Sequence, residues 1–260
     1  QQGEEHPTVG GLRIGKQLNE RKPNEPSDER LEWDQDGQYY HYLTKWMHAL
    51  NCVSQDTGDP AYIRWAIELA KTAYAKFTFA PSYGDRKRMH WKMSIDLSYP
   101  LVPSMGQHDP LDGFVTYCEL QAAAANYLDG SSYPDLGHEI VDMARICQGI
   151  QLPTNDPLGI GGLLYDACRI AQLIAKGQIR DPSLLETVVH AASMGIESFK
   201  ISGSLEYPAE YRLAFRELGL SIGLSAVERM LAIIEENPNV FRQMSSLPQI
   251  IEDLREYMPL

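Results

Sequence analysis

The chain has 260 residues, of which 43% are hydrophobic and 22% are charged, a composition that is ordinary for a globular protein with a substantial core. Its formal net charge is −12 and its only tight basic cluster is Arg86-Lys87-Arg88, so the composition excludes the broad positive surface that nucleic-acid binding requires. No stretch approaches about 18 consecutive apolar residues, which argues against a membrane-spanning segment.

The four cysteines, Cys52, Cys118, Cys147 and Cys168, lie among apolar neighbours and lack the CxxC spacing of metal and redox sites. We therefore expect buried, inert thiols and a reducing, cytoplasmic setting. Because the sequence does not begin with Met, a signal peptide would not be visible in it. No cofactor is predicted, since the glycine-rich run 159–162 follows no predicted strand and does not resemble a dinucleotide site.

Residues 1–30 are polar and rich in Pro, Gly and charge, which favours an irregular arm over a domain of its own. Within this arm, the apolar side chains of Val9, Leu12 and Ile14 are the candidates that fix it to the rest of the protein. Residues 31–260 are predicted to form a single all-α domain of helical hairpins.

Acidic turns that open a small-residue helix recur three times, each followed by a second helix start at a similar distance. The distances are 23, 22 and 25 residues, from Asp36 to Asp59, from Asp112 to Pro134 and from Asp156 to Asp181. Such regular spacing predicts one helical hairpin used repeatedly.

The first hairpin is predicted to have an inner helix from about Gly37 to Val53 and an outer helix that Asp59 caps and Pro60 begins. The inner helix also carries a polar stripe at helical spacing, formed by His41, Lys45, His48 and Cys52. A polar stripe on an otherwise apolar helix is unusual for a packed core, so we expect it to face a cavity.

Residues 80–108 interrupt the hairpins and are predicted to form a long loop. Loops longer than about 15 residues within a compact array are more often functional than idle. This one carries several side chains suited to substrate contact or proton transfer, namely His90, Trp91, Lys92, Asp96, Gln107 and His108.

The second hairpin is predicted to begin at Asp109, to continue through the alanine run 122–125 and to turn at 129–132. Its outer helix is expected over Asp135 to Cys147. Alanine runs allow helices to approach closely, as inner helices must around a common axis.

The third hairpin has three glycines, Gly159, Gly161 and Gly162, early in its inner helix. Each costs helix stability of about 1 kcal/mol relative to alanine, which favours a close approach of the backbone to a neighbour or ligand. A fourth unit begins near Tyr207 and lacks the acidic opening, as terminal repeats commonly do.

The acidic helix starts supply the candidate catalytic residues. If the inner helices run parallel around an axis, Asp36, Asp112 and His108 meet at one rim, where carboxylates and an imidazole suit acid–base chemistry. Crowding raises the pKa of one carboxyl, while a helix N-terminus favours the ionised form of another. The alternative is that each aspartate only caps its helix, which is the common use of Asp at that position.

Residues predicted to bind substrate surround this rim. Trp33 and Trp91 are flanked by charged residues, and aromatic faces in such places stack against sugar rings. The other candidates are His41, His48, His90, Lys92 and Asp109. The histidines would also suit a metal, but no HExxH or HxH motif supports one, so no metal is predicted.

The hairpin period over residues 31–260 and the acidic helix starts at 31–50 and 108–113 resemble the six-hairpin α/α toroid superfamily. That superfamily includes glycoside hydrolases and N-acylglucosamine 2-epimerase-like sugar isomerases. The resemblance is architectural, and about four of the six hairpins are recognisable. It implies a site at the mouth of the inner helices, at Asp36, His41, His90, His108 and Asp112.

The leading prediction is a carbohydrate-active hydrolase, in which one carboxylic acid protonates the glycosidic oxygen and another carboxylate activates water. The alternatives are a sugar isomerase or epimerase that exchanges a proton through His48, His90 or His108, and a noncatalytic helical-repeat scaffold. The expected partner is a small-molecule or oligosaccharide substrate, without nucleic acid or membrane. The sequence does not predict an oligomeric state.

Overall fold

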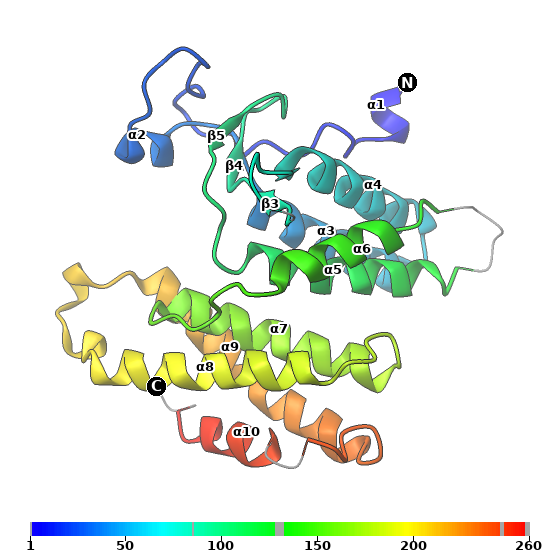
Figure 1. Cartoon of the computed structure of the whole chain (residues 1–260), viewed down its shortest axis with the longest axis vertical. Helices are drawn as coiled ribbons and strands as arrows, with labels where there is room; N and C mark the ends of the chain where they lie inside the picture. Colours follow the sequence, from blue (N-terminus) through cyan, green and yellow to red (C-terminus); the bar gives the residue numbers. More distant parts are fainter. Residues whose placement is uncertain (1, 85, 128–132, 245–246, 258–260) are drawn as a thin grey trace. The chain divides into compact units, whose positions relative to one another are not determined.

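The computed structural model describes residues 2–84, 86–127, 133–244 and 247–257 (Figure 1). The chain forms two compact units, Gln1–Ile150 and Gln151–Leu260. The structure is mostly helical, with about 60% helix and 5% strand, as predicted for an all-α protein. The boundary at residue 150 falls inside the range that the sequence assigned to one domain. The toroidal closure remains a prediction.

The first unit is built on two helical hairpins. Its helices are α1 (Gln2–Glu5), α2 (Glu29–Asp34), α3 (Tyr40–Thr57), α4 (Pro60–Phe77), α5 (Asp109–Ala124) and α6 (Gly137–Cys147). Helix α3 packs against α4 and α5, and α5 packs against α6. As predicted, the Asp59 side chain caps α4 by accepting a hydrogen bond from the Ala61 N–H. The predicted turn at 129–132 lies outside the described residues.

The interval predicted as a loop, 80–108, carries short strands. The strands of the first unit are β1 (Gln38–Tyr39), β2 (Thr78–Phe79), β3 (Arg88–Met89), β4 (Lys92–Met93) and β5 (Pro100–Val102). Strand β4 pairs antiparallel with β1 and β5, and β2 pairs with β3. Strands of two or three residues are too short to show alternating hydrophobicity, so no sequence pattern predicts them. The β1-β4-β5 sheet brings Tyr39, Lys92 and Val102 side by side.

Residues 1–30 lie on the first unit, mainly through polar contacts. The Ile14 N–H donates to the Gly37 carbonyl (2.9 Å) and the Leu12 N–H to Oε1 of Gln38 (2.8 Å). Leu12 also packs against the apolar core, as predicted, whereas Val9 is more than half exposed. The arm is therefore fixed by backbone hydrogen bonds more than by the apolar side chains that the sequence suggested.

The second unit consists of helices and two short 3-10 turns. The helices are α7 (Pro157–Ala175), α8 (Ser183–Ile201), α9 (Ala214–Glu236) and α10 (Leu247–Arg255), and the turns are η1 (Ser204–Glu206) and η2 (Ala209–Tyr211). Helix α7 packs against α8 and α9, and α10 against both of these. As predicted, Asp156 caps α7 by accepting from the Gly159 N–H at 3.0 Å.

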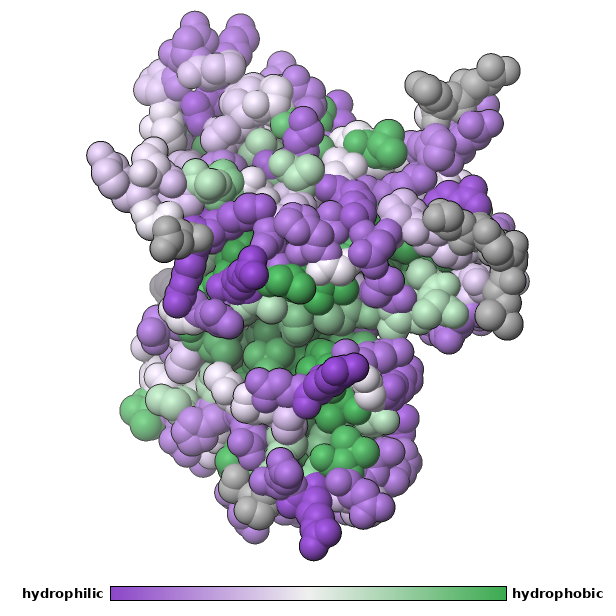
Figure 2. Space-filling model, turned by 45° about the vertical axis from the view of Figure 1, so that its right-hand side comes forward, coloured by the Kyte–Doolittle hydropathy of each residue, from purple (hydrophilic) through white to green (hydrophobic). Residues whose placement is uncertain are grey.

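Helix α7 is, among the described residues, the one helix that is long and apolar enough to cross a membrane by length and composition alone. Of that stretch, 67% is buried in the protein, as is usual for a core helix. On the face that Figure 2 shows, hydrophobic side chains are exposed in patches among polar ones. In the second unit, exposed Phe215, Leu218 and Ile222 recur at helical spacing along α9.

Candidate functional site

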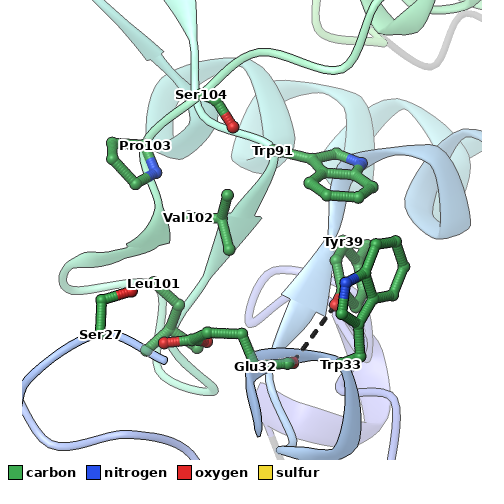
Figure 3. A pocket seen from close by; sticks show the side chains of 9 residues that line it. All are labelled: Ser27, Glu32, Trp33, Tyr39, Trp91, Leu101, Val102, Pro103 and Ser104. Carbon is green, nitrogen blue, oxygen red and sulfur yellow. Dashed lines mark hydrogen bonds between the residues drawn. The ribbon is translucent and has the colours of Figure 1, made fainter. Parts of the chain in front are cut away.

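A cavity of about 490 Å³ opens beside the β1-β4-β5 sheet of the first unit (Figure 3). Its walls come from α2 and the segment before it, from β1, from the β3–β4 connection and from β5 with the residues that follow. The lining residues are Ser27, Glu32, Trp33, Tyr39, Trp91, Leu101, Val102, Pro103 and Ser104. The structure thus brings together Trp33 and Trp91, which the sequence suggested as substrate contacts.

Three aromatic rings form one side of this cavity (Figure 3). The centroids of Trp33 and Trp91 are 5.0 Å apart with an interplanar angle of 79°, and those of Tyr39 and Trp91 are 5.5 Å apart. Trp33 is 51% exposed, whereas Tyr39 is 4% exposed. Tyr39 is therefore a buried part of the cavity wall, whereas the indole of Trp33 is accessible to solvent.

Glu32 places a carboxylate in the cavity wall. Its Oε1 forms an ion pair with Nε of Arg21, and its Oε2 lies 3.6 Å from Nζ of Lys92. Oε2 accepts no hydrogen bond from any described residue, although it is buried. Arg21 therefore holds one oxygen of this carboxylate, and the buried Lys92 ammonium lies beside the other.

Lys92, a predicted substrate contact, is fully buried behind this wall. Its ammonium group donates to the carbonyls of Glu32 (2.6 Å) and Gln35 (2.9 Å), at the C-terminal end of α2. It also lies 5.1 Å from the centroid of the Tyr39 ring. Burial lowers the pKa of Lys92, and the Glu32 charge partly opposes that effect. These contacts fix the helix that carries Trp33.

His41, in the first turn of α3, does not line the cavity but contacts Trp91, which does. Trp91 Nε1–H donates to Nδ1 of His41 at 3.4 Å. Burial lowers the pKa of His41 to about 4, although the nearby Asp112 charge acts in the opposite direction. His41 is therefore neutral near physiological pH and accepts a hydrogen bond from the cavity wall.

Asp112 and Asp109 share the first turn of α5. Asp112 Oδ2 accepts hydrogen bonds from Thr44 Oγ1 (2.6 Å) and Lys45 Nζ (3.0 Å), both on α3. Asp109 is also buried, and its Oδ2 has no hydrogen-bond partner among the described residues. Burial, with repulsion from Asp112, raises the pKa of Asp109 to about 7. Two neighbouring carboxyl groups thus have different environments, which is the usual basis of an acid–base pair.

His108 precedes this pair as the N-cap residue of α5. Its side chain makes no capping hydrogen bond, and its carbonyl accepts from the Asp112 N–H at 3.0 Å. In this structure the backbone of His108 therefore starts the helix that holds the two carboxyl groups.

Asp36 has different partners. It is fully buried, and its Oδ1 accepts from the Gly15 N–H (2.8 Å) and the Gly37 N–H (2.9 Å). Arg13 lies 2.6 Å from its Oδ2. Burial raises the pKa of Asp36, but these backbone donors and the Arg13 charge outweigh it, so the net pKa is lowered. Asp36 has the contacts of a residue that fixes the N-terminal arm, and its catalytic role stays a prediction.

The other predicted histidines have separate neighbours. His48 Nδ1 lies 3.5 Å from Glu119 Oε2. His90 stacks on Phe79, with centroids 4.2 Å apart, and burial lowers the pKa of His90. Of the cysteines expected to be buried, Cys118 and Cys168 are buried, Cys147 is half-buried and Cys52 is exposed. Within the described ranges, no three His, Cys, Asp or Glu side chains are grouped as metal ligands.

Sequence reasoning missed Tyr39, Glu32 and Arg21. Tyr39 fits the apolar period of the first inner helix, but that helix begins at Tyr40, and Tyr39 lies in strand β1. Glu32 directly precedes Trp33, and this adjacency was the one available signal. Arg21 was hidden in the arm, because its pairing with Glu32 is a tertiary contact.

Comparison with known proteins gives no match. No family model matches the sequence, and neither a curated protein nor a solved structure is significantly similar to it.

Proposed function

We propose that this protein is a carbohydrate-active enzyme of the hydrolase type, which holds a sugar ring in the aromatic cavity. The proposal is carried by one observation, the grouping of Trp33, Tyr39 and Trp91 around about 490 Å³ of open space that Glu32 also lines. Sugar rings have apolar faces that pack on aromatic rings and hydroxyl edges that seek carboxylates. The volume is within the range of small-molecule sites, roughly 300–1,000 Å³.

The reaction is assigned to the carboxyl groups of α5. His41 links the cavity wall at Trp91 to α3, which holds Asp112 through Thr44 and Lys45. Asp109, with its pKa raised to about 7, is the acid that protonates the glycosidic oxygen. Asp112, which accepts hydrogen bonds from Thr44 and Lys45, is assigned the second role, in which a carboxylate activates water or attacks the sugar carbon.

Replacing Asp109 or Asp112 with asparagine is expected to lower turnover by about 10²–10⁴-fold, since each variant removes one proton-transfer group. Release of reducing ends from an oligosaccharide panel measures turnover, and tryptophan fluorescence measures sugar binding, which should persist. Asp59→Asn is the matched control, because asparagine caps a helix as well as aspartate does. Full turnover in both α5 variants, with the fold intact, would rule out this assignment.

The Asp109 carboxyl should also make stability depend on pH. Its pKa is raised from 3.8 to about 7, so the native protein holds a proton that the unfolded chain has released. The resulting stabilisation is complete below about pH 4 and is lost as the pH rises through about 7. We expect Asp109→Asn to gain thermal stability relative to the unmodified protein between about pH 5 and about pH 8. Parallel melting temperatures across that range would contradict the shift.

The isomerase or epimerase alternative is supported by the position of His41 between the cavity and Asp112. A pKa of about 4, however, makes this imidazole a weak base near neutral pH. Reaction in deuterated water separates the two activities. Deuterium bound to carbon in the recovered sugar would indicate proton exchange beside a carbonyl, whereas new reducing ends without such label indicate hydrolysis.

A further inference from the structure

We propose that the aromatic cavity selects uncharged, hydroxyl-bearing sugar rings and rejects sugars that carry an ammonium group. This inference rests on the proposed carbohydrate function and specifies the substrate class of the same cavity. It is drawn from the charges and the ring geometry of the cavity wall.

Glu32 is the carboxylate of the cavity wall. The residue is 4% exposed and lines the cavity, and its buried Oε2 lies 3.6 Å from the Lys92 ammonium. Its negative charge is therefore already paired inside the protein and is not offered to a ligand.

The charge of Glu32 is already balanced inside the protein. Arg21 forms an ion pair with Oε1, and Lys92 lies 3.6 Å from Oε2. The remaining carboxylate that acts on Lys92, Asp36, has its own cation in Arg13, and Lys16 adds a further positive charge. Glu32 would therefore offer an entering ammonium group no unpaired negative charge, and Lys92 and Arg21 would repel it.

The aromatic faces are also poorly placed for a cation. Aromatic cages hold ammonium groups over open ring faces. Here the Lys92 ammonium already lies over Tyr39, at 5.1 Å from the ring centroid. The two indoles meet at 79°, so the edge of one faces the ring of the other. A neutral sugar can still use the exposed side of Trp33, because packing on a ring does not require a free electrostatic face.

The test uses the unmodified protein and β-1,4-linked tetrasaccharides of glucose, N-acetylglucosamine and glucosamine, followed by tryptophan fluorescence and calorimetry. At about pH 6 the glucosamine amines are ammonium groups, and at about pH 9 they are largely neutral. We expect the neutral tetrasaccharides to bind at least about tenfold more tightly than the glucosamine one at the lower pH. The difference should close at the higher pH, while the affinity for N-acetylglucosamine stays constant.

Two tryptophan variants locate the binding. Trp33→Ala should weaken the neutral sugar by about tenfold or more, a loss typical of removing one stacking aromatic. Trp46→Ala is the matched control, because Trp46 is similarly exposed (54% against 51%) and does not line the cavity. Glu32→Gln should reject glucosamine further, since it removes the carboxylate that lies between Arg21 and Lys92. If that variant does not fold, the ligand comparison on the unmodified protein still decides.

The outcomes separate this inference from the proposed function. The charge selection would be overturned if glucosamine tetrasaccharide or tetramethylammonium bound at about pH 6 as tightly as the neutral sugars and lost that affinity in Trp33→Ala. Carbohydrate binding itself would still stand. If neither these sugars nor a wider panel of neutral oligosaccharides bind, the proposed function itself fails, and this inference fails with it.

Discussion

Replacing Gly161 with alanine is expected to lower the free energy of unfolding of the second unit by about 3 kcal/mol, near the upper end for an overpacked core. A Cβ at this position would lie 2.0 Å from the Gly219 carbonyl oxygen and 2.8 Å from the Leu220 nitrogen. Both atoms belong to the backbone of α9, so no side-chain rotation relieves the clash. Gly223 faces the same contact, since its own Cβ would lie 2.4 Å from the Cα of Gly161.

Gly162→Ala is the matched control for Gly161→Ala. Gly162 follows Gly161 on the same helix, is exposed, and has no atom within 4 Å of an added Cβ. Alanine there should stabilise the protein by about 0.5–1 kcal/mol, because glycine is the weaker helix former. The two substitutions are chemically identical, so opposite shifts in stability can be assigned to the α7–α9 contact alone.

Urea denaturation followed by far-ultraviolet circular dichroism measures both glycine variants. All four tryptophans lie within residues 1–150, so fluorescence follows the first unit separately. We expect Gly161→Ala to lower the urea concentration at which the dichroism signal is lost, and to leave the fluorescence transition almost unchanged. Stability shifts of equal sign in the two variants would mean that α7 and α9 do not touch at Gly161.

Helix positions were predictable where the signal is local. Asp59 and Asp156 each precede a proline and an apolar period, and both cap the helices that the sequence assigned to them. The glycine-rich start of α7 likewise indicated a close backbone approach. Sequence alone did not say that Gly161 makes the contact and Gly162 does not, because the partner glycine lies 58 residues later, at Gly219.

The candidate site was predictable only in part, for the same physical reason. Charged neighbours pointed to Trp33 and Trp91 as individual contacts, and the structure places both on one cavity. The two residues come together because β1 pairs with β4. Strands of two residues have no hydrophobic period, so this pairing could not be predicted from the sequence. The buried ion pair between Glu32 and Lys92 joins residues that are 60 positions apart in the sequence, and it depends on the pairing of strand β1 with strand β4.

Replacing Lys92 with methionine is expected to destabilise the first unit by about 3–5 kcal/mol, the range for removing one partner of a buried ion pair. Methionine keeps much of the side-chain volume but removes the donor to the Glu32 and Gln35 carbonyls. It also leaves the buried Glu32 carboxylate with Arg21 as its remaining counter-charge. Urea denaturation followed by tryptophan fluorescence measures the loss, and Lys76→Met, at an exposed position of α4, should change stability by less than about 0.5 kcal/mol.

The same substitution tests whether Lys92 also shapes the cavity. Its ammonium group fixes the C-terminal end of α2, and Trp33 lies on that helix one residue after Glu32. In conditions where Lys92→Met is still folded, acrylamide should therefore quench its tryptophan fluorescence more strongly, and neutral sugars should bind more weakly. Lys76→Met should show neither change. Lower stability with unchanged quenching and sugar affinity would mean that Lys92 supports the fold of the first unit while Trp33 is held by its ring contacts with Trp91 and Tyr39.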